Sequence, residues 1–449
     1  MRREPSCGDR AEAPIRFWQV RAAHVAHPRA RPGSAAMIRA NLLAILFAAA
    51  FSAQAKSPPA GAPAMPDTAL VRELLNQDPA VAAAQANLRA ARSAAGILED
   101  SPYEWTPSAS AQRRNVNTGE HYNEWNIGVD RTIRLPGKAS ADKDIAGGVL
   151  GEARAKYRYE VHNSATELMT LWVDWLHAEA AHRLAQTNHA TVLRSVQAVE
   201  KRMKAGDASR LDLGLAQAEL AEQNRQASEA ATLNDMAWSR LSMRFPGIER
   251  KPSELPQPEA LAYEDSDLRM RIVDASEALQ IVQSQLAQSQ ATAARARAER
   301  VPDPTVGLYT ASERGGAERY WGVRVSIPIP GGARMKRADQ AAANADVSFQ
   351  GLELKRRQLN AEVSSDIAAA RGSLLTSEVA RQNADMLAKN AALMQRAYSL
   401  GEADLQSLLM AKRQDTGATA SALAARAEAL KAAYKLQIDA HLIWDLDKD

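Results

Sequence analysis

Two stretches of the sequence, residues 138–204 and 333–399, each run for roughly 65 residues without a proline. In the first, apolar residues recur at spacings of three and four, as at Leu168, Leu171 and Trp175, which predicts α-helix. At 1.5 Å per residue, such a helix is about 100 Å long, whereas an average globular helix has about 11–12 residues. Helices of this length cannot bury an apolar stripe in a small core, so they must lie along other long helices.

An alternation of apolar and polar residues precedes each predicted rod. In residues 125–135 most odd positions are apolar and the residues between them are mainly polar, and residues 321–329 repeat this pattern. The apolar positions are Trp125, Ile127, Val129, Ile133 and Leu135, then Trp321, Val323, Val325, Ile327 and Ile329. A period of two predicts strands. Together with polar turns at 115–121 and 313–318, it predicts two β-hairpins, at 103–136 and 302–330.

Both hairpins end in the same dipeptide, Pro136-Gly137 and Pro330-Gly331, 194 residues apart. Proline cannot donate to a strand ladder and suits the first turn of a helix. Glycine can take the positive φ of a sharp bend. We therefore interpret both dipeptides as strand-to-helix junctions and not as catalytic motifs.

A second landmark repeats at almost the same distance. GDASRLDLGLA begins at Gly206 and GEADLQSLLMA begins at Gly401, an offset of 195 residues. Because two independent landmarks repeat at nearly the same distance, they indicate a tandem duplication of a unit made of helix, hairpin, long helix, turn and helix. The predicted repeats span 67–260, with its turn at 204–210, and 261–449, with its turn at 399–405.

Within these repeats we expect a helix from about Asp67, with Asp67 as its N-cap. A second is expected from Asp267 to about Arg300, and a final helix reaches Trp444.

The N-terminal part has the features of a targeting segment. Residues 37–55 hold Arg39, a short apolar run from Leu42 to Phe51 and the small-residue site Ala53-Gln54-Ala55. This pattern is typical of a secretory signal peptide, and the apolar run is too short for a permanent membrane span; a buried helix is the alternative. Residues 1–36 are then an upstream extension, and 56–66, rich in Pro, Ala and Gly, a linker.

Removing residues 1–55 changes the charge of the chain. They hold eight of the 56 Lys and Arg residues and three of the 53 acidic ones, so the remainder has 48 basic and 50 acidic residues. This balance gives no argument for nucleic-acid binding. The single cysteine, Cys7, also lies there, so the mature chain has neither disulfides nor a thiolate metal site.

No enzyme or cofactor motif is present in the sequence. His177, His182 and His189 are spaced by five and seven residues, which does not make a helical pair of metal ligands. The other histidines after residue 55, His121, His162 and His441, are dispersed along the chain. We therefore predict that the protein is not an enzyme and has neither a cofactor nor a bound metal.

The strand pattern points to a membrane. A lipid-facing apolar band with aromatic residues at its borders is typical of outer-membrane strands. The candidate belt residues are Trp105, Tyr122, Trp125, Tyr309, Tyr320 and Trp321. Four strands cannot close a barrel and open edges are not tolerated in lipid, but three copies supply twelve strands. A soluble four-stranded sheet with one wet face is the alternative.

These features together resemble the TolC-type outer-membrane efflux proteins. The resemblance rests on the signal peptide, the duplicated halves, LPGK (135–138), IPGG (329–332) and the Gly-acid pairs 206–207 and 401–402, and it covers 67–447. The form LPGK after the first hairpin resembles the motif of one branch of this family, the branch that works with heavy-metal resistance-nodulation-division pumps. The resemblance implies a mainly α fold with a small β part. The homotrimer would form a twelve-stranded outer-membrane β-barrel, four strands per protomer, continued by a periplasmic α-helical barrel.

The resemblance also implies site residues and partners. Gly206, Asp207, Gly401 and Glu402 would contact a periplasmic adaptor (membrane fusion) protein, which joins an inner-membrane pump. The candidate residues of the pore aperture are Asp212 and, at the matching place in the second turn, Ser407, which is not an acid. A basic gate residue is expected two positions after Gly401, but that position holds Ala403.

The function implied is a passive exit duct for heavy-metal cations or small toxic compounds in the outer membrane of a Gram-negative cell. The alternative is a periplasmic adaptor-like helical scaffold of a transport system.

Overall fold

The computed structural model of the protein describes residues 65–251 and 254–444. The chain divides into residues 1–55 and residues 56–449, and only the second unit contains described residues. The predicted upstream extension, the signal peptide and most of the linker lie outside the described residues.

Helices and strands alternate in two similar series. The first series is α1 (Thr68–Asn76), α2 (Pro79–Glu99), β1 (Thr106–Asn115), β2 (His121–Thr132), α3 (Pro136–Lys204) and α4 (Arg210–Arg244). The second is α5 (Asp265–Ala275), α6 (Glu277–Ala298), β3 (Thr305–Glu313), the short 3-10 turn η1 (Arg314–Gly316), β4 (Glu318–Ser326), α7 (Gly332–Leu400) and α8 (Leu405–Asp439).

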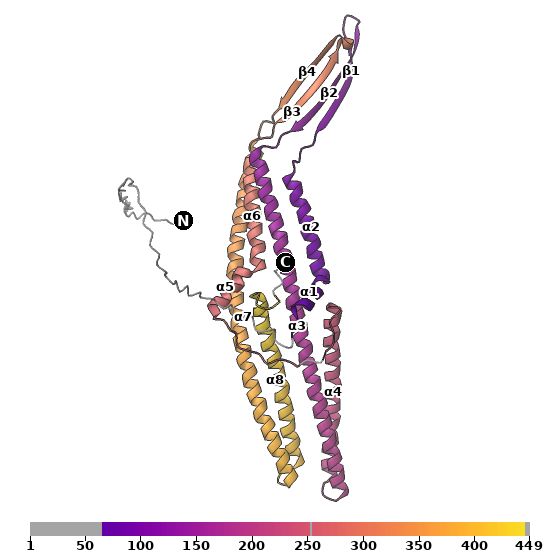
Figure 1. Cartoon of the computed structure of the whole chain (residues 1–449), viewed down its shortest axis with the longest axis vertical. Coiled ribbons are helices and arrows are strands. Elements are labelled where there is room, and N and C mark those ends of the chain that lie inside the picture. Colours follow the sequence, from indigo (N-terminus) through magenta and orange to yellow (C-terminus); the bar gives the residue numbers. More distant parts are fainter. Residues whose placement is uncertain (1–64, 252–253, 445–449) are drawn as a thin grey trace, which may run out of the picture. The chain divides into compact units, whose positions relative to one another are not determined.

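The four strands form one antiparallel sheet in the order β1-β2-β3-β4. Each predicted hairpin is present, and β2 pairs with β3 to join them, with the hydroxyl oxygens of Thr132 and Thr305 2.8 Å apart. The edge strands of the sheet are therefore β1 and β4. Within the described unit, the sheet lies at one end of the long helices and the turns α3–α4 and α7–α8 at the other (Figure 1).

The two predicted rods are confirmed. Helices α3 and α7 each have 69 residues, and α4 and α8 each have 35. Helix α3 packs against α2, α4, α6 and α8, and α7 packs against α6 and α8. No helix among the described residues combines the length and the apolar character that crossing a bilayer requires.

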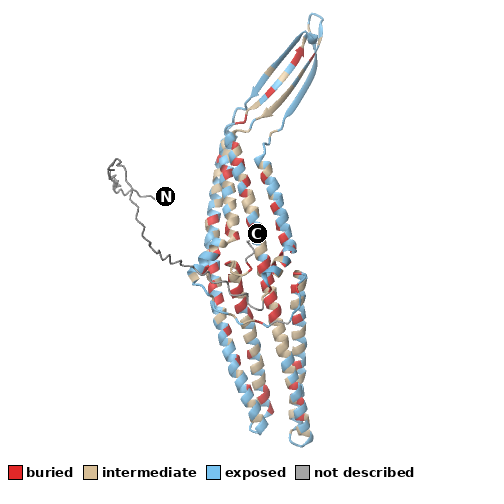
Figure 2. Cartoon of the chain, in the orientation of Figure 1, coloured by how far each residue is buried: buried red, intermediate tan, exposed pale blue. Residues whose placement is uncertain are grey.

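The largest apolar core surrounds the middle of α3, where α1, the end of α4 and α8 meet it (Figure 2). Trp175 is fully buried there, between the rings of Trp172 and Trp238 at centroid distances of 5.0 and 5.1 Å. A second core joins α5, α6, α7 and the end of α8. A buried ion pair supports the first core, because both terminal nitrogens of Arg244 contact Asp78, the N-cap of α2, at 2.9 and 2.8 Å.

The Pro-Gly dipeptides do mark strand-to-helix junctions, but they differ in register. Pro136 is the first residue of α3, whereas Pro330 precedes Gly331, the N-cap of α7. Gly331 has a φ of −98°, and Gly137 is not among the glycines with positive φ. The prediction that these glycines supply a left-handed bend is therefore wrong, because the helices begin directly from extended backbone.

Two predicted helix boundaries are also wrong. The helix expected over 267–300 is divided at Ser276, whose hydroxyl oxygen accepts a hydrogen bond from the backbone N–H of Leu279 and so caps α6. The last helix ends at Asp439, before Trp444. Its end is fixed by His441, which has a φ of 54°, and by a hydrogen bond from Leu442 N–H to the Gln437 carbonyl; this is the pattern of a Schellman C-cap.

Candidate functional site

The turn between α3 and α4 begins with a left-handed glycine. Gly206 has a φ of 83°, a conformation that glycine adopts without steric cost. Its N–H donates to the carbonyl of Met203, and Asp207 N–H donates to the carbonyl of Arg202 at 2.8 Å. These two bonds form a Schellman cap, so Gly206 ends the rod and turns the chain by its backbone conformation.

The turn between α7 and α8 has the same construction. Gly401 has a φ of 78°, its N–H donates to the Tyr398 carbonyl, and Glu402 N–H donates to the Ala397 carbonyl at 2.9 Å. The glycine and the acid after it are exposed in both turns. The two Gly-acid pairs identified in the sequence therefore occupy equivalent, accessible positions.

Each turn also carries one carboxylate and one hydroxyl three residues apart, in opposite order. In the first, Ser209 caps α4 and the Asp212 carboxylate accepts from the Ser209 N–H and hydroxyl at 2.9 and 2.8 Å. In the second, Asp404 caps α8 and its carboxylate accepts from the Ser407 N–H and hydroxyl at 2.8 and 2.9 Å. Both turns thus hold an acid at a helix N-terminus.

Asp404 is a residue that the sequence comparison missed. Aligning the turns residue by residue pairs Asp212 with Ser407 and finds no acid in the second turn. The hydrogen bond from the Ser407 backbone N–H lowers the pKa of Asp404, because it stabilises the ionised carboxylate. The second turn therefore carries a negative charge at neutral pH.

The two turns are held together side by side. The Arg202 guanidinium lies 3.6 Å from Asp207, measured from Nε to Oδ2, and 5.2 Å from the ring centre of Tyr398 on α7. Beneath them is an apolar cluster of residues from both helical hairpins: Val196, Val199, Ala216, Leu405, Leu408 and Leu409. This packing fixes the spacing of the turns within one chain.

At the other end of the rods, the sheet has one apolar and one polar face. The strand register brings apolar side chains of neighbouring strands together, and they are exposed although large. The exposed members are Trp125, Ile127, Val306, Leu308, Trp321, Val323 and Val325. Trp321 is the most open of them, at 79% exposure. An exposed apolar face of this size is typical of a surface that meets lipid or another chain.

The opposite face of the sheet is lined by charged and polar residues. Glu124 is buried there against Arg114 at 2.8 Å and Gln112 at 2.9 Å, and Asp130 lies 3.6 Å from Arg324. This face is crowded at Gly322, where a Cβ would lie 2.7 Å from the far end of the Tyr309 ring, so the ring would have to move.

The six aromatic residues predicted to form one belt do not share a face. Side chains alternate along a strand, so Tyr122, Tyr309 and Tyr320 lie on the polar face, where the rings of Tyr309 and Tyr320 meet edge to face at 6.3 Å. Trp125 and Trp321 lie on the apolar face. Trp105 precedes β1 and is 63% exposed, with Arg131 over its ring. The belt prediction is therefore wrong for the tyrosines.

The structure also corrects the view that the histidines are dispersed. His162 on α3, Glu277 at the start of α6 and His441 after α8 come together, with their side-chain ligand atoms within 4.8 Å of one another. Burial alone would raise the pKa of Glu277, but the hydrogen bond from His441 and the charge of His162 hold it below its ordinary value. No local sequence pattern connects these three residues.

Comparisons with known proteins agree with this architecture. Residues 70–243 match the family of outer membrane efflux proteins. The solved outer-membrane channel OprN is 20% identical, with a TM-score of 0.72 over 84% of this chain and 90% of its own.

Two further channels have the same fold. The open-state outer membrane channel MtrE of Neisseria gonorrhoeae is 17% identical, with a TM-score of 0.70 over 83% of this chain and 88% of its own. CusC, a protein that folds into a transmembrane channel, is 15% identical, with a TM-score of 0.68 over 83% of this chain and 91% of its own. A search of curated proteins found no match.

Proposed function

We propose that this chain is a TolC-type outer membrane efflux protein, as the match of residues 70–243 and the shared fold support, and that three copies form the exit duct of a tripartite efflux system. Proteins of this family are outer-membrane channels with a periplasmic helical part, and they are not enzymes. Transport energy would then come from a pump in the inner membrane, and this chain would conduct passively.

The observation that carries the proposal is the open four-stranded sheet. Its outer strands β1 and β4 have unpaired edges within one chain, and one of its faces is apolar and exposed. Unpaired backbone groups are costly in lipid, so the edges must pair with another copy. Three copies with β4 of each beside β1 of the next give a closed barrel of twelve strands.

The matched helix lengths support the proposed duplication. Both long helices have 69 residues and both returning helices have 35. With three copies, two helical hairpins from each chain supply six in a ring, and the six turns lie at its periplasmic end. The exposed pairs Gly206-Asp207 and Gly401-Glu402 are the proposed contacts with the adaptor protein.

We assign the aperture to the capping carboxylates. Asp212, proposed from the sequence with Ser407, is joined by Asp404, so a trimer would carry six acids around its narrow end. Rings of carboxylates favour cations, which fits a duct for heavy-metal cations or for small toxic compounds of positive charge. Ser407 takes part by holding Asp404 through the two hydrogen bonds described above.

Conductance across a planar bilayer tests this assignment. The purified protein is expected to give discrete, cation-selective steps, and the pair Asp212→Asn and Asp404→Asn is expected to reduce the selectivity. Glu402→Gln is the control, since it removes a nearby charge outside the capping pairs. If the double variant keeps the wild-type selectivity, the carboxylates do not line the aperture; if the protein never conducts, the duct function itself is refuted.

A further inference from the structure

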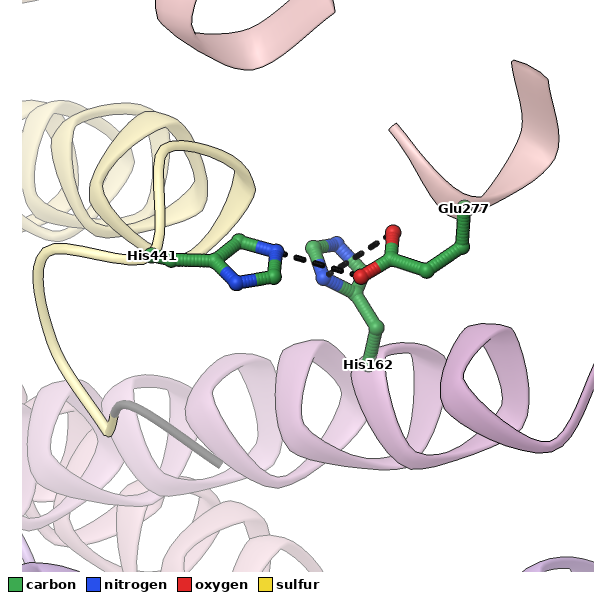
Figure 3. A group of neighbouring side chains, drawn as sticks. All are labelled: His162, Glu277 and His441. Carbon is green, nitrogen blue, oxygen red and sulfur yellow. Dashed lines mark ion pairs between the residues drawn. The ribbon is translucent and has the colours of Figure 1, made fainter. Parts of the chain in front are cut away.

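His162, Glu277 and His441 form a cluster of side chains (Figure 3). His162 lies well inside α3, which runs from Pro136 to Lys204, and the proposed duct does not use the cluster. The Nε2 atom of His441 lies 3.1 Å from Oε1 of Glu277, and Nδ1 of His162 lies 4.0 Å from Oε2. All three side chains point into one space between α3, the start of α6 and the segment after α8. We infer that they form a binding site for a divalent transition-metal cation.

The separations suit such an ion. Two ligands that each lie about 2.1 Å from zinc are at most roughly 4.2 Å apart. The contacts of His441 and His162 with Glu277, at 3.1 and 4.0 Å, already satisfy this limit. The largest separation in the group, up to 4.8 Å, needs to close by roughly 0.6 Å, which a change of side-chain torsion provides.

His162 has the second partner that metal-binding histidines usually have. Its Nε2 lies 3.0 Å from Oδ1 of Asp439, the last residue of α8. A proton on Nε2, donated to Asp439, leaves the lone pair of Nδ1 directed at Glu277. A carboxylate that orients a ligating imidazole in this way commonly supports metal sites.

His441 is held in a conformation that its residue type seldom adopts. Its φ is 54°, in the left-handed region where non-glycine residues are uncommon. Glycine is the usual residue at this position of a Schellman cap. The strained backbone directs the imidazole toward Glu277, and strain of this kind often occurs at functional sites.

A cavity of about 510 Å³ reaches two of the three proposed ligands, His162 and Glu277, and four further acids line it, Glu167, Glu362, Asp366 and Asp439, against two lysines. His441 lines a neighbouring cavity of about 20 Å³, together with His162, Glu277 and Arg158. Of the two lysines, Lys435 is engaged by Asp366 and Asp439 at 2.6 and 3.0 Å. The excess of carboxylates favours entry of a cation.

The donor set defines the class of ion. Two imidazoles and one carboxylate suit Zn²⁺, Co²⁺, Ni²⁺ or Cu²⁺ better than Mg²⁺ or Ca²⁺, which prefer oxygen ligands. Because the three ligands come from α3, α6 and the chain after α8, a bound ion would join both halves of the chain at mid-length. Binding is expected to stabilise the folded state in proportion to its affinity. This site stands independently of the proposed duct.

The test uses the full mature chain in detergent, purified without a histidine tag and stripped with chelator, then titrated with Co²⁺. One equivalent per chain is expected, with the visible absorption of a four- or five-coordinate cobalt site that Zn²⁺ abolishes. His441→Gly removes a ligand while placing glycine where the backbone favours it, so the fold is retained and the cobalt absorption is lost. Glu277→Gln is expected to lose it as well, and Asp439→Asn to weaken binding roughly 10- to 100-fold.

His189→Gln, on the same helix as His162, is the matched control and is expected to bind like wild type. Circular dichroism of each variant reports whether its helices remain. Absence of cobalt binding at concentrations on the order of 1 mM by the wild-type chain overturns the proposal. Binding that persists in both folded variants, His441→Gly and Glu277→Gln, also overturns it, because the ion would then lie elsewhere.

Discussion

Two adjacent glycines of α3 should respond to alanine in opposite directions. Gly148 faces α6, and a Cβ there would lie 2.9 Å from the Cβ of Gln288 and 3.0 Å from its Cα and backbone nitrogen. Ordinary contact begins at 3.4 Å, and backbone atoms cannot rotate away. A Cβ on Gly147 would meet nothing within 4 Å. Gly148 therefore permits close approach of α3 and α6, and Gly147 does not contribute to it.

The expected magnitudes follow from these distances. Alanine in place of glycine stabilises a helix by about 0.5–1 kcal/mol at either position. At Gly148 the helices must also separate by roughly half an ångström, and overpacking of this kind costs about 1–3 kcal/mol. The helix term is common to both variants, so the difference between Gly147→Ala and Gly148→Ala isolates the steric cost. With an unfolding entropy near 2.1 cal/mol/K per residue, that difference is roughly 1–4 °C in melting temperature.

Thermal melting of both variants, followed by far-ultraviolet circular dichroism in the same detergent, measures this difference. Gly147→Ala is expected to melt slightly above wild type and Gly148→Ala below it. If Gly148→Ala melts at or above Gly147→Ala, the close packing of α3 on α6 does not exist as described.

Other predictions concern the buried ion pair and the turns. Asp78→Asn should cost about 1.5–3 kcal/mol, because partly exposed Arg244 loses a charged hydrogen-bond partner but keeps Glu167; melting against Glu167→Gln, which removes the exposed partner of Arg244, checks this. Burial raises the pKa of Asp78, but its bonds from Arg244 and Ser164 hold it below 3.8. Its contribution is therefore complete above about pH 3.8 and lost as the pH falls through the lowered pKa. Wild type and Asp78→Asn should accordingly converge in acid melts. Ser209→Ala should cost about 1 kcal/mol and speed hydrogen exchange in the first turn of α4 alone.

Much of the architecture could be predicted because its signals are local. A period of two identifies the strands, long runs without proline identify the rods, and glycines at 206 and 401 end them. These features depend on residues within a few positions of one another. The break at Ser276 was missed because neither proline nor glycine stands beside it. The end of α8 was missed because histidine, not glycine, takes the left-handed position.

Other features required the three-dimensional structure or a different reading of the sequence. Asp404 was overlooked because the two turns were aligned residue by residue, which pairs Asp212 with Ser407. In the structure the acid and the serine exchange places between the turns, so the counterpart of Asp212 is Asp404, three residues before Ser407. The sequence alone could have shown which face Tyr320 occupies. It is adjacent to Trp321 in the same strand, and successive side chains of a strand point to opposite faces. His162, Glu277 and His441 meet only through the packing of three helical segments, which no local pattern encodes.

The central claim is that β1 of one copy pairs with β4 of the next, and disulfide cross-linking tests it most directly. Cys7 is the single cysteine of the sequence, so engineered cysteines report without background once it is removed. Ala109→Cys on β1 is combined in turn with cysteine at Trp321, Val323 or Val325, all on the apolar face of the sheet.

At least one of these pairs should give a covalent ladder that ends at three chains. Ile127→Cys on the inner strand β2, combined with the same β4 positions, should give none. The predicted result is that cross-linked species of up to three chains form with a β1–β4 cysteine pair and do not form with the β2–β4 pairs. Failure of every edge pair to link separate chains, or a ladder that extends beyond three, would contradict the proposed barrel.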